Sequence, residues 1–330
     1  MRMRSRRSRL RPFGLALALA LAACGRAATG RQVWFGPDMG SPDMIELFTQ
    51  PQRWRAARQA TYVFKFYEQQ LLADTAADCR DCGRNIYPEM ARAEAFTRLN
   101  AWGVRIGIEV GVIKSWGCAA SATLPLAMEA VRRVETRRAV VTELAMDEPL
   151  LGAESCQLSL DEAARHAAVF ARDARAGRPH LRVGDTEPYP YFSAPTLLTW
   201  VSTLRQNGFT PAFFHLDVDR AYAGRIGADV ASDLALLRAS LEGQGIPFGV
   251  IFWSDVGASD EAYFTDVMAW VETVRMAIGE PTHSIFQSWA VAPDGRLTVP
   301  ANLPEADPAS HTHTRLLDEG LAALRGGTRR

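Results

Sequence analysis

Short apolar segments recur along the chain about every 36 residues, and stretches with helical periodicity lie between them. The segments are rich in valine, isoleucine and phenylalanine, as expected for strands that are buried on both faces. Alternating strands and helices predict a parallel sheet with the helices outside. Eight repeats over about 300 residues predict a single-domain α/β structure, a closed (β/α)8 TIM barrel. We expect the strands to begin near Val33, Tyr62, Val104, Ala139, His180, Pro211, Pro247 and His283.

Local signals place several helices between these strands. Ser159 and Glu162 form a capping box at the start of one helix, and Ser193 is expected to cap another. Ser41 and Pro42 are expected to open a further helix, because proline is suited to the first helical position. The other predicted helices cover residues 123–138, 194–207, 228–242 and 260–278.

The first 23 residues have the composition of an export signal rather than of a folded segment. Six arginines precede an apolar run over residues 13–23, which is too short to span a membrane. The run ends in Leu21-Ala22-Ala23-Cys24, which resembles the lipobox of bacterial lipoproteins and implies cleavage before Cys24 and acylation of its sulfur. Residues 5–11 partly resemble a twin-arginine export motif, although an ordinary basic leader is the preferred interpretation.

We therefore predict a signal peptide over residues 1–23, a lipidated tether over 24–32, the barrel over 33–326 and a disordered tail over 327–330. The protein is expected to be a monomer that is exported and lipid-anchored in the bacterial envelope, at its periplasmic face or outer membrane. Without the six arginines of the signal, 31 basic and 37 acidic side chains remain, which gives a net charge of −6. This acidic balance argues against a nucleic acid as partner.

Four further cysteines follow the second, third and fourth predicted strands. Because their number is even and the predicted compartment is oxidising, they favour two disulfides whose connectivity is open. A four-cysteine zinc site and a redox-active C-x-x-C pair are the alternatives. The four residues are Cys79, Cys82, Cys118 and Cys156.

Carboxylates follow most of the predicted strands, at the edge where barrels of this kind carry their active sites. Glu148 and Glu187 each precede a proline, which ends the strand and holds the acid at the rim. Crowded carboxylates raise one another's pKa values, so a proton can be held near neutral pH. The acids at this edge are Asp38, Glu68, Glu109, Asp147, Glu148, Asp185, Glu187, Asp217, Asp219 and Asp255.

Asp147-Glu148-Pro149 after the fourth strand and Trp289 after the eighth resemble motifs of the (β/α)8 glycoside hydrolases. Members of that superfamily use two carboxylates, on strands four and seven, and commonly carry the acid/base glutamate in an Asn-Glu-Pro turn. The resemblance implies hydrolysis of an O-glycosyl bond in a polysaccharide or oligosaccharide, with Glu148 as general acid/base and Trp289 as the floor of the sugar site. Asp147 departs from the asparagine of the family, and Asp255 departs from its strand-seven glutamate.

The second catalytic carboxylate stays open at this point: Asp255 fits by position, whereas Glu187 and Asp217 fit by chemistry. Lys65 is one of only two lysines beside 35 arginines, and we expect its ammonium group to pair with Glu109. Aromatic side chains near the rim could stack on sugar rings. The residues expected to bind substrate are Asp38, Lys65, Glu109, Asp147, His215, Trp253, Gln287 and Trp289.

Two other functions remain open beside the preferred glycosidase. One is a metal-dependent barrel enzyme in which His215, Asp217, Glu187 and Glu148 bind a divalent cation. The other is an inactive barrel that binds a carbohydrate without cleaving it. The preferred hydrolytic mechanism uses neither a metal nor another cofactor.

Overall fold

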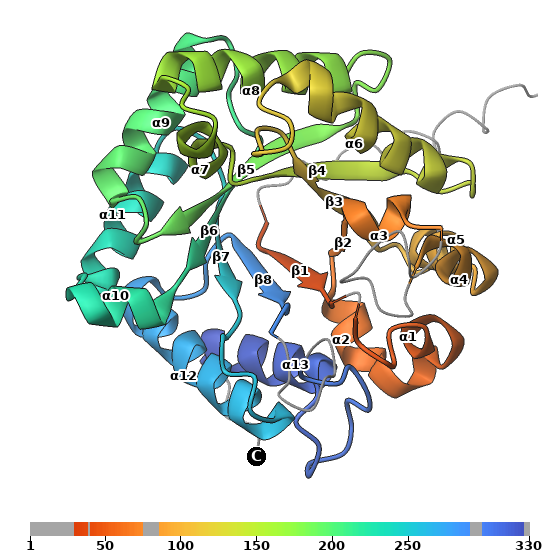
Figure 1. Cartoon of the computed structure of the whole chain (residues 1–330). Helices are drawn as coiled ribbons and strands as arrows, with labels where there is room; N and C mark the ends of the chain where they lie inside the picture. Colours follow the sequence, from red (N-terminus) through yellow and green to blue (C-terminus); the bar gives the residue numbers. More distant parts are fainter. Residues whose placement is uncertain (1–29, 39, 75–85, 291–298, 327–330) are drawn as a thin grey trace, which may run out of the picture. The chain divides into compact units, whose positions relative to one another are not determined.

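Eight parallel strands form a closed barrel in the computed structural model, which describes residues 30–38, 40–74, 86–290 and 299–326. Each strand pairs with the next along the chain, and β8 pairs with β1 to close the barrel (Figure 1). This confirms the predicted (β/α)8 fold, and every strand begins within three residues of its predicted start. The strands are β1 (Gln32–Gly36), β2 (Val63–Tyr67), β3 (Arg105–Gly111), β4 (Val141–Asp147), β5 (Arg182–Tyr189), β6 (Phe214–Val218), β7 (Phe248–Phe252) and β8 (His283–Gln287).

Helices surround the barrel and connect its strands (Figure 1). Between β1 and β2 lie α1 (Glu46–Thr49), the 3-10 helix η1 (Pro51–Trp54) and α2 (Arg55–Ala60), and before β3 lie α3 (Glu68–Leu72), α4 (Tyr87–Arg92) and α5 (Ala95–Ala101). The later helices are α6 (Ala120–Glu135), α7 (Pro149–Ser155), α8 (Leu160–Ala174), α9 (Ala194–Gln206), α10 (Arg220–Ile226), α11 (Val230–Glu242), α12 (Asp260–Ile278) and α13 (His313–Leu324).

Two of the predicted helix starts are confirmed and one is wrong. Ser159 caps α8 in a reciprocal capping box with Glu162, and the Ser193 hydroxyl accepts a hydrogen bond at the start of α9. The helix predicted at Ser41 does not form, and α1 begins only at Glu46. The Ser41 hydroxyl instead donates to Asp43 at 2.7 Å and accepts from the Asn302 amide at 2.7 Å, so this segment is tied to the chain after β8.

The barrel interior is filled by a small aromatic cluster, separate from the larger core between strands and helices. Trp34 and Phe213 pack there against His215, with ring centroids 4.7 and 4.5 Å away. The cluster leaves no room for a side chain at Gly184, because a Cβ atom there would lie 2.2 Å from the Phe213 ring. This filled interior leaves the strand ends as the place for a cavity.

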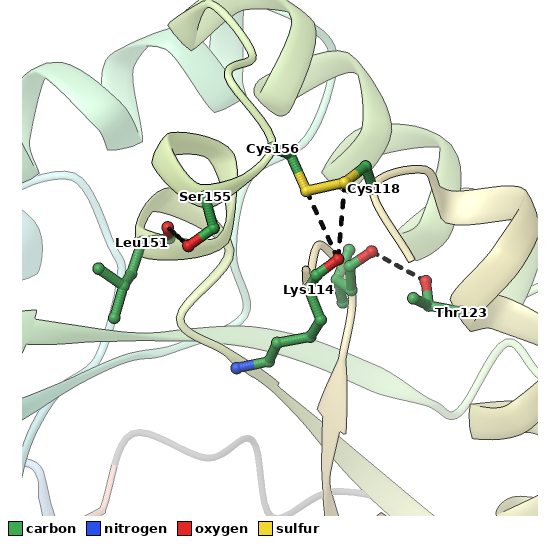
Figure 2. The surroundings of a disulfide bond; sticks show 7 residues. Lys114, Cys118, Thr123, Leu151, Ser155 and Cys156 are labelled. Carbon is green, nitrogen blue, oxygen red and sulfur yellow. Dashed lines mark hydrogen bonds between the residues drawn. A yellow bond between two sulfur atoms is a disulfide. The ribbon is translucent and has the colours of Figure 1, made fainter. Parts of the chain in front are cut away.

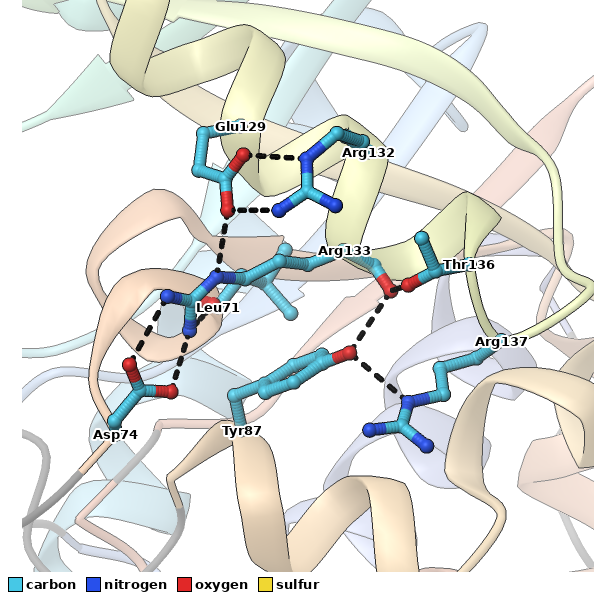
Figure 3. A network of polar contacts seen from close by, with 8 residues as sticks. All are labelled: Leu71, Asp74, Tyr87, Glu129, Arg132, Arg133, Thr136 and Arg137. Carbon is cyan, nitrogen blue, oxygen red and sulfur yellow. Dashed lines mark hydrogen bonds and ion pairs between the residues drawn. The ribbon is translucent and has the colours of Figure 1, made fainter.

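A polar network holds the end of α3, the helix that begins with Glu68 at the barrel rim (Figure 3). Arg133 of α6 donates to both oxygens of Asp74, at 2.8 and 3.1 Å, and to the Leu71 carbonyl oxygen at 3.2 Å. The Tyr87 hydroxyl donates to the Arg133 carbonyl oxygen at 3.0 Å. These contacts fasten the carboxyl end of α3 to α6, on the outside of the barrel.

Several predictions fall on residues outside those that the structure describes. They are the signal peptide, the lipidation site at Cys24, most of the tether, the tail over 327–330, and the cysteines Cys79 and Cys82. Within the described ranges, none of the helices combines the length and the apolar character that crossing a membrane requires.

Candidate functional site

Two adjoining cavities open at the carboxyl ends of the strands, the edge that the sequence predicts. The larger has a volume of about 330 Å³ and the smaller about 240 Å³, and both are lined by Glu148, Asp217 and Trp289. The larger is also lined by Tyr67, Glu68, Gln69, Glu109, Gly111, Lys114, Trp116, Asp147, Thr186, Ile251 and Gln287, and the smaller by Pro188, Tyr189, Tyr191, Asp219, Tyr222 and Trp253. Glu148 and Asp217 therefore stand where the two cavities meet.

The backbone at Glu148 turns the chain from β4 into α7. Pro149 is the first residue of α7 and disfavours a right-handed helical conformation in the residue before it. Glu148 accordingly adopts a left-handed conformation, with φ 49° and ψ 53°. Its N–H donates to the Thr186 carbonyl oxygen of β5 at 2.9 Å, which fixes the turn. An uncommon backbone conformation at a cavity-lining acid is typical of functional sites.

The carboxyl groups of Glu148 and Asp217 are both disposed to keep a proton. Burial, followed by the charge of Asp147, raises the pKa of Glu148 to about 7. Burial, followed by the charges of Glu148 and Glu109, raises the pKa of Asp217 well above its ordinary value. Because burial and neighbouring charges oppose ionisation of both groups, the site retains a proton near neutral pH, as general acid catalysis requires.

The two lysines of the chain each pair with one acid of this site. Lys65 is fully buried in β2, and its ammonium lies 2.5 Å from Glu109, as predicted. Lys114 lies 2.5 Å from Asp147, and the sequence reasoning missed it. The sequence did hold a signal for this residue, because Lys114 is the second of only two lysines in a chain with 35 arginines. The lysines balance Glu109 and Asp147 and leave Glu148 and Asp217 without a cation of their own.

Polar and aromatic groups complete the cavity walls. The Gln287 side-chain amide donates to the Tyr67 hydroxyl at 2.6 Å. Gln287 ends β8 and Tyr67 ends β2, so the contact joins the two strands on either side of β1. The Trp253 and Trp289 rings lie 4.4 Å apart between centroids, at an interplanar angle of 32°. Together they form an apolar wall beside Asp217, of the kind on which a sugar ring can stack.

A disulfide holds the loop that carries Lys114 (Figure 2). Cys118 and Cys156 are joined with their Cα atoms 5.6 Å apart, which confirms that these two cysteines form a disulfide at the rim where the strands end. Their sulfur atoms lie 3.7 and 3.4 Å from the Lys114 carbonyl oxygen. The bond therefore joins the β3–α6 loop, which carries Lys114, to the end of α7.

Removing this disulfide is expected to destabilise the protein. The bond joins residues 38 positions apart, and replacing Cys118 and Cys156 together with serine should lower the free energy of unfolding by about 2–4 kcal/mol. Urea denaturation of the wild-type and double-variant proteins measures this difference. An unchanged denaturation midpoint would show that the crosslink does not stabilise the rim.

Glu187 and Asp185 lie behind the cavity wall rather than in it. Both are fully buried, and the Glu187 carboxylate accepts a hydrogen bond from the Leu150 N–H of α7 at 2.8 Å. The Asp185 carboxylate accepts from the Trp200 indole N–H at 2.8 Å. Glu187 thus holds the first turn of the helix that follows Glu148, instead of facing the cavity as the sequence reasoning allowed.

Lys65, which lies behind Glu109, and three other predicted site residues line neither cavity. Asp255 is exposed, because β7 ends at Phe252 and the acid falls in the following loop. Asp38 is buried and accepts a hydrogen bond from the Gly40 N–H. His215 is buried in the aromatic cluster, where its Nε2 atom lies 2.9 Å from Nδ1 of His283.

The metal-dependent alternative finds no support in this geometry. In residues 30–38, 40–74, 86–290 and 299–326, no three or more histidine, cysteine, aspartate or glutamate side chains are grouped as metal ligands. The proposed set fails because His215 points into the barrel core and Glu187 lies behind the wall. His313 is also fully buried, at the start of α13.

The buried acids predict that stability falls as pH rises above about 6.5. Burial raises the pKa values of Glu68, Glu148 and Asp185 to about 7, so the folded state holds protons that the unfolded state has lost. Buried His283 and His313, whose pKa values burial lowers to about 3, act in the opposite direction, but only below pH 6.5. Each acid contributes a slope of up to about 1.4 kcal/mol per pH unit. Urea denaturation should therefore give a lower free energy of unfolding at pH 8 than at pH 6.5, and equal values would contradict the assigned burial.

Comparison with known proteins identifies the fold of this chain but assigns it to no family. No family model and no curated protein matches this sequence. Among solved structures, the catalytic domain of a hyperthermophilic chitinase from Pyrococcus furiosus is similar at 15% identity and a TM-score of 0.51, over 91% of this chain and 99% of that one. A psychrophilic glycoside hydrolase family 10 endo-beta-1,4-xylanase is similar at 9% identity and a TM-score of 0.50, over 82% of this chain and 91% of that one. At these identities the likeness shows that the chain has the (β/α)8 fold that these glycoside hydrolases share.

Proposed function

We propose that the protein is a glycoside hydrolase that cleaves an oligosaccharide or polysaccharide between its two rim cavities. The observation that carries this proposal is the position of Glu148 and Asp217, two carboxyl groups that line both cavities at their junction. A glycosidic bond lying across the junction would have a sugar in each cavity and both acids beside it. Cleavage of such a bond uses one protonated and one ionised carboxyl group.

Glu148 is the general acid in this proposal. Its pKa of about 7 keeps it largely protonated at mildly acidic pH, so it can donate a proton to the departing glycosidic oxygen. Asp217 is the second carboxylate and attacks the sugar or activates a water molecule. Burial and the charges of Glu148 and Glu109 raise the pKa of Asp217, and the charge of Lys65 opposes this rise, so ionisation of Asp217 in this proposal depends on Lys65. Trp289 and Trp253 supply the apolar surface for the sugar ring.

This assignment moves the second carboxylate from strand seven to strand six. The resemblance to two-carboxylate barrels implies an acid after β7, but that strand contributes Ile251 and Trp253 to the cavities. Asp217 on β6 lines both cavities together with Glu148, and the charge of Glu148 helps to raise the pKa of Asp217. The catalytic pair would therefore come from β4 and β6.

Hydrolysis of a panel of glycans tests the proposal. Wild-type protein is expected to release reducing ends from at least one oligosaccharide, and Glu148→Gln protein to release far fewer from the same one. If the wild type and the variant both bind an oligosaccharide and neither cleaves any member of the panel, the protein is a carbohydrate-binding barrel instead.

We also propose that the protein is anchored to the bacterial envelope through a lipid on Cys24. The lipobox-like segment and the short apolar run before it support this proposal. In cells that express the full chain, a Cys24→Ser variant should move from the membrane fraction to the soluble fraction or keep its uncleaved signal. Wild-type protein that is washed from membranes by salt alone would contradict a covalent lipid anchor.

A further inference from the structure

The walls of both cavities carry a strong excess of acid. Five carboxyl groups and a single lysine line the larger cavity, and three carboxyl groups line the smaller, where the described residues include no lysine or arginine. The acids are Glu68, Glu109, Asp147, Glu148, Asp217 and Asp219. This excess is concentrated here, because the chain without the predicted signal has a net charge of only −6.

Arginine is the side chain best suited to bind carboxylate, sulfate or phosphate groups on a ligand. The chain contains 35 arginines, yet none lies among the described residues that line these cavities. The two lysines are already engaged, Lys65 with Glu109 and Lys114 with Asp147, at 2.5 Å in each case. The described part of the walls therefore offers no unpaired cation to an anionic sugar, and its carboxylates repel one.

Among the described residues, Glu68, Glu148 and Asp217 form no ion pair, although Lys114 acts on the first two and Lys65 on the third from a distance. The Oδ1 atom of Asp217 is buried and accepts no hydrogen bond from the residues that the structure describes. Burial raises the pKa values of Glu68 and Glu148 to about 7, which means that the cavity walls stabilise their ionised forms poorly. An ammonium group on a ligand would supply both the hydrogen-bond donors and the charge.

Aromatic surfaces stand at both ends of the double cavity. Trp116 lines the larger cavity with its side chain 59% exposed, and Tyr191 lines the smaller with its side chain 53% exposed. Trp289 lies between them and lines both cavities. Exposed rings on either side of Glu148 suit a chain of sugars that continues in both directions, and their faces also attract ammonium groups.

We propose that the substrate is a polymer of amino sugars with free, positively charged amino groups, which spans both cavities and places an ammonium among Glu68, Glu148 and Asp217. This inference rests on the proposed function, since it names the substrate class of the same site. Chains of neutral sugars, including fully N-acetylated ones, lack the charge that the carboxylates would bind. Chains of uronic acids carry the charge that the carboxylates repel.

Binding and cleavage of three defined probes test this inference. The probes are oligomers of glucosamine, N-acetylglucosamine and galacturonic acid, matched in length. At low salt, Glu148→Gln protein should bind the glucosamine oligomer at least about tenfold more tightly than the acetylated one in calorimetry, and the difference should shrink at high salt. Wild-type protein should cleave the glucosamine oligomer or a partly acetylated chain and leave the galacturonate intact.

Two matched substitutions separate the cavity charge from the overall charge. Glu68→Gln, made in the Glu148→Gln background, should weaken binding of the glucosamine oligomer several-fold and leave binding of the acetylated oligomer unchanged. Asp173→Asn is the control, because Asp173 is a partly exposed acid at the end of α8 that pairs with the neighbouring Arg172, at 2.7 Å. The substitution makes the same change in net charge. It should change neither affinity.

The outcomes distinguish this inference from the proposed function. The inference is overturned if the acetylated or galacturonate oligomer binds as tightly as the glucosamine oligomer or more tightly. The glycosidase proposal still stands in that case if the wild type cleaves such a probe and the Glu148→Gln protein does not. Binding of glucosamine oligomers that depends on Glu68, with no cleavage of any probe, supports the cationic site and counts against hydrolysis. Absence of glucosamine binding at low salt overturns the inference.

Discussion

Replacing Glu148 with glutamine is expected to lower kcat by about 10²–10⁴-fold, the range that a general acid typically contributes. Glutamine keeps the size of the side chain and the N–H that donates to Thr186, so the turn into α7 should persist. What it loses is the proton that the cavity environment holds near neutral pH. Initial rates on the cleaved glycan, with a denaturation curve for each protein, separate lost chemistry from lost fold.

Asp255→Asn is the matched control for this experiment. Asp255 is the strand-seven acid that the resemblance puts forward, but it is exposed and lines neither cavity. Its removal should leave kcat within about twofold of wild type, since a solvated loop carboxylate makes little difference at a distance. Strong loss of activity in Asp255→Asn with full activity in Glu148→Gln would reverse the assignment.

The pH dependence of the reaction gives an independent check on Glu148. A general acid works in its protonated form, so kcat/KM should fall above pH 7 as Glu148 ionises. This alkaline limb should be absent from any residual activity of the Glu148→Gln protein. A wild-type profile that stays flat to pH 9 would mean that another group donates the proton.

The strands could be predicted because their signal is local. Each is a short apolar run bounded by helical periodicity, and parallel pairing then follows from the alternation. The pairing of Lys65 with Glu109 was also within reach, because adjacent strands β2 and β3 carry the two residues at nearby register positions. A rare lysine inside a buried strand needs such a partner.

The arrangement inside the barrel could not be predicted in the same way. His215 and Asp217 lie on the same face of β6, yet the first packs against His283 in the core and the second reaches the cavity. Which of them reaches the rim depends on the stagger between strands, and His283 is 68 residues away. Asp255 was misplaced for a related reason, since β7 ends three residues before it.

Lys114 was missed because its position is set by contacts between loops. It lies three residues beyond β3, where no periodic pattern applies. The Cys118–Cys156 disulfide and the pairing with Asp147 bring it to the cavity. The even number of cysteines predicted crosslinks at this rim, but the sequence alone does not say which loop they would tie down.

Replacing Asp217 with glycine is expected to lower turnover by about 10²–10⁴-fold, because the reaction loses the carboxylate that attacks the sugar or activates water. Glycine also opens a space beside the sugar in which a small anion can bind. Added azide should therefore restore part of the turnover of an aryl glycoside with a good leaving group, and the product should be a glycosyl azide.

Asp219→Asn is the control for Asp217, because Asp219 lies two residues further along and also lines the smaller cavity. Its carboxylate accepts a hydrogen bond from the Tyr222 N–H at 2.7 Å at the start of α10, and asparagine can keep that cap. Asp219→Asn should retain most activity and show no response to azide. Azide rescue of an Asp255→Gly variant, with none for Asp217→Gly, would return the second carboxylate to strand seven. The cavity geometry favours the opposite result, because Asp217 shares both cavities with Glu148 and Asp255 lines neither.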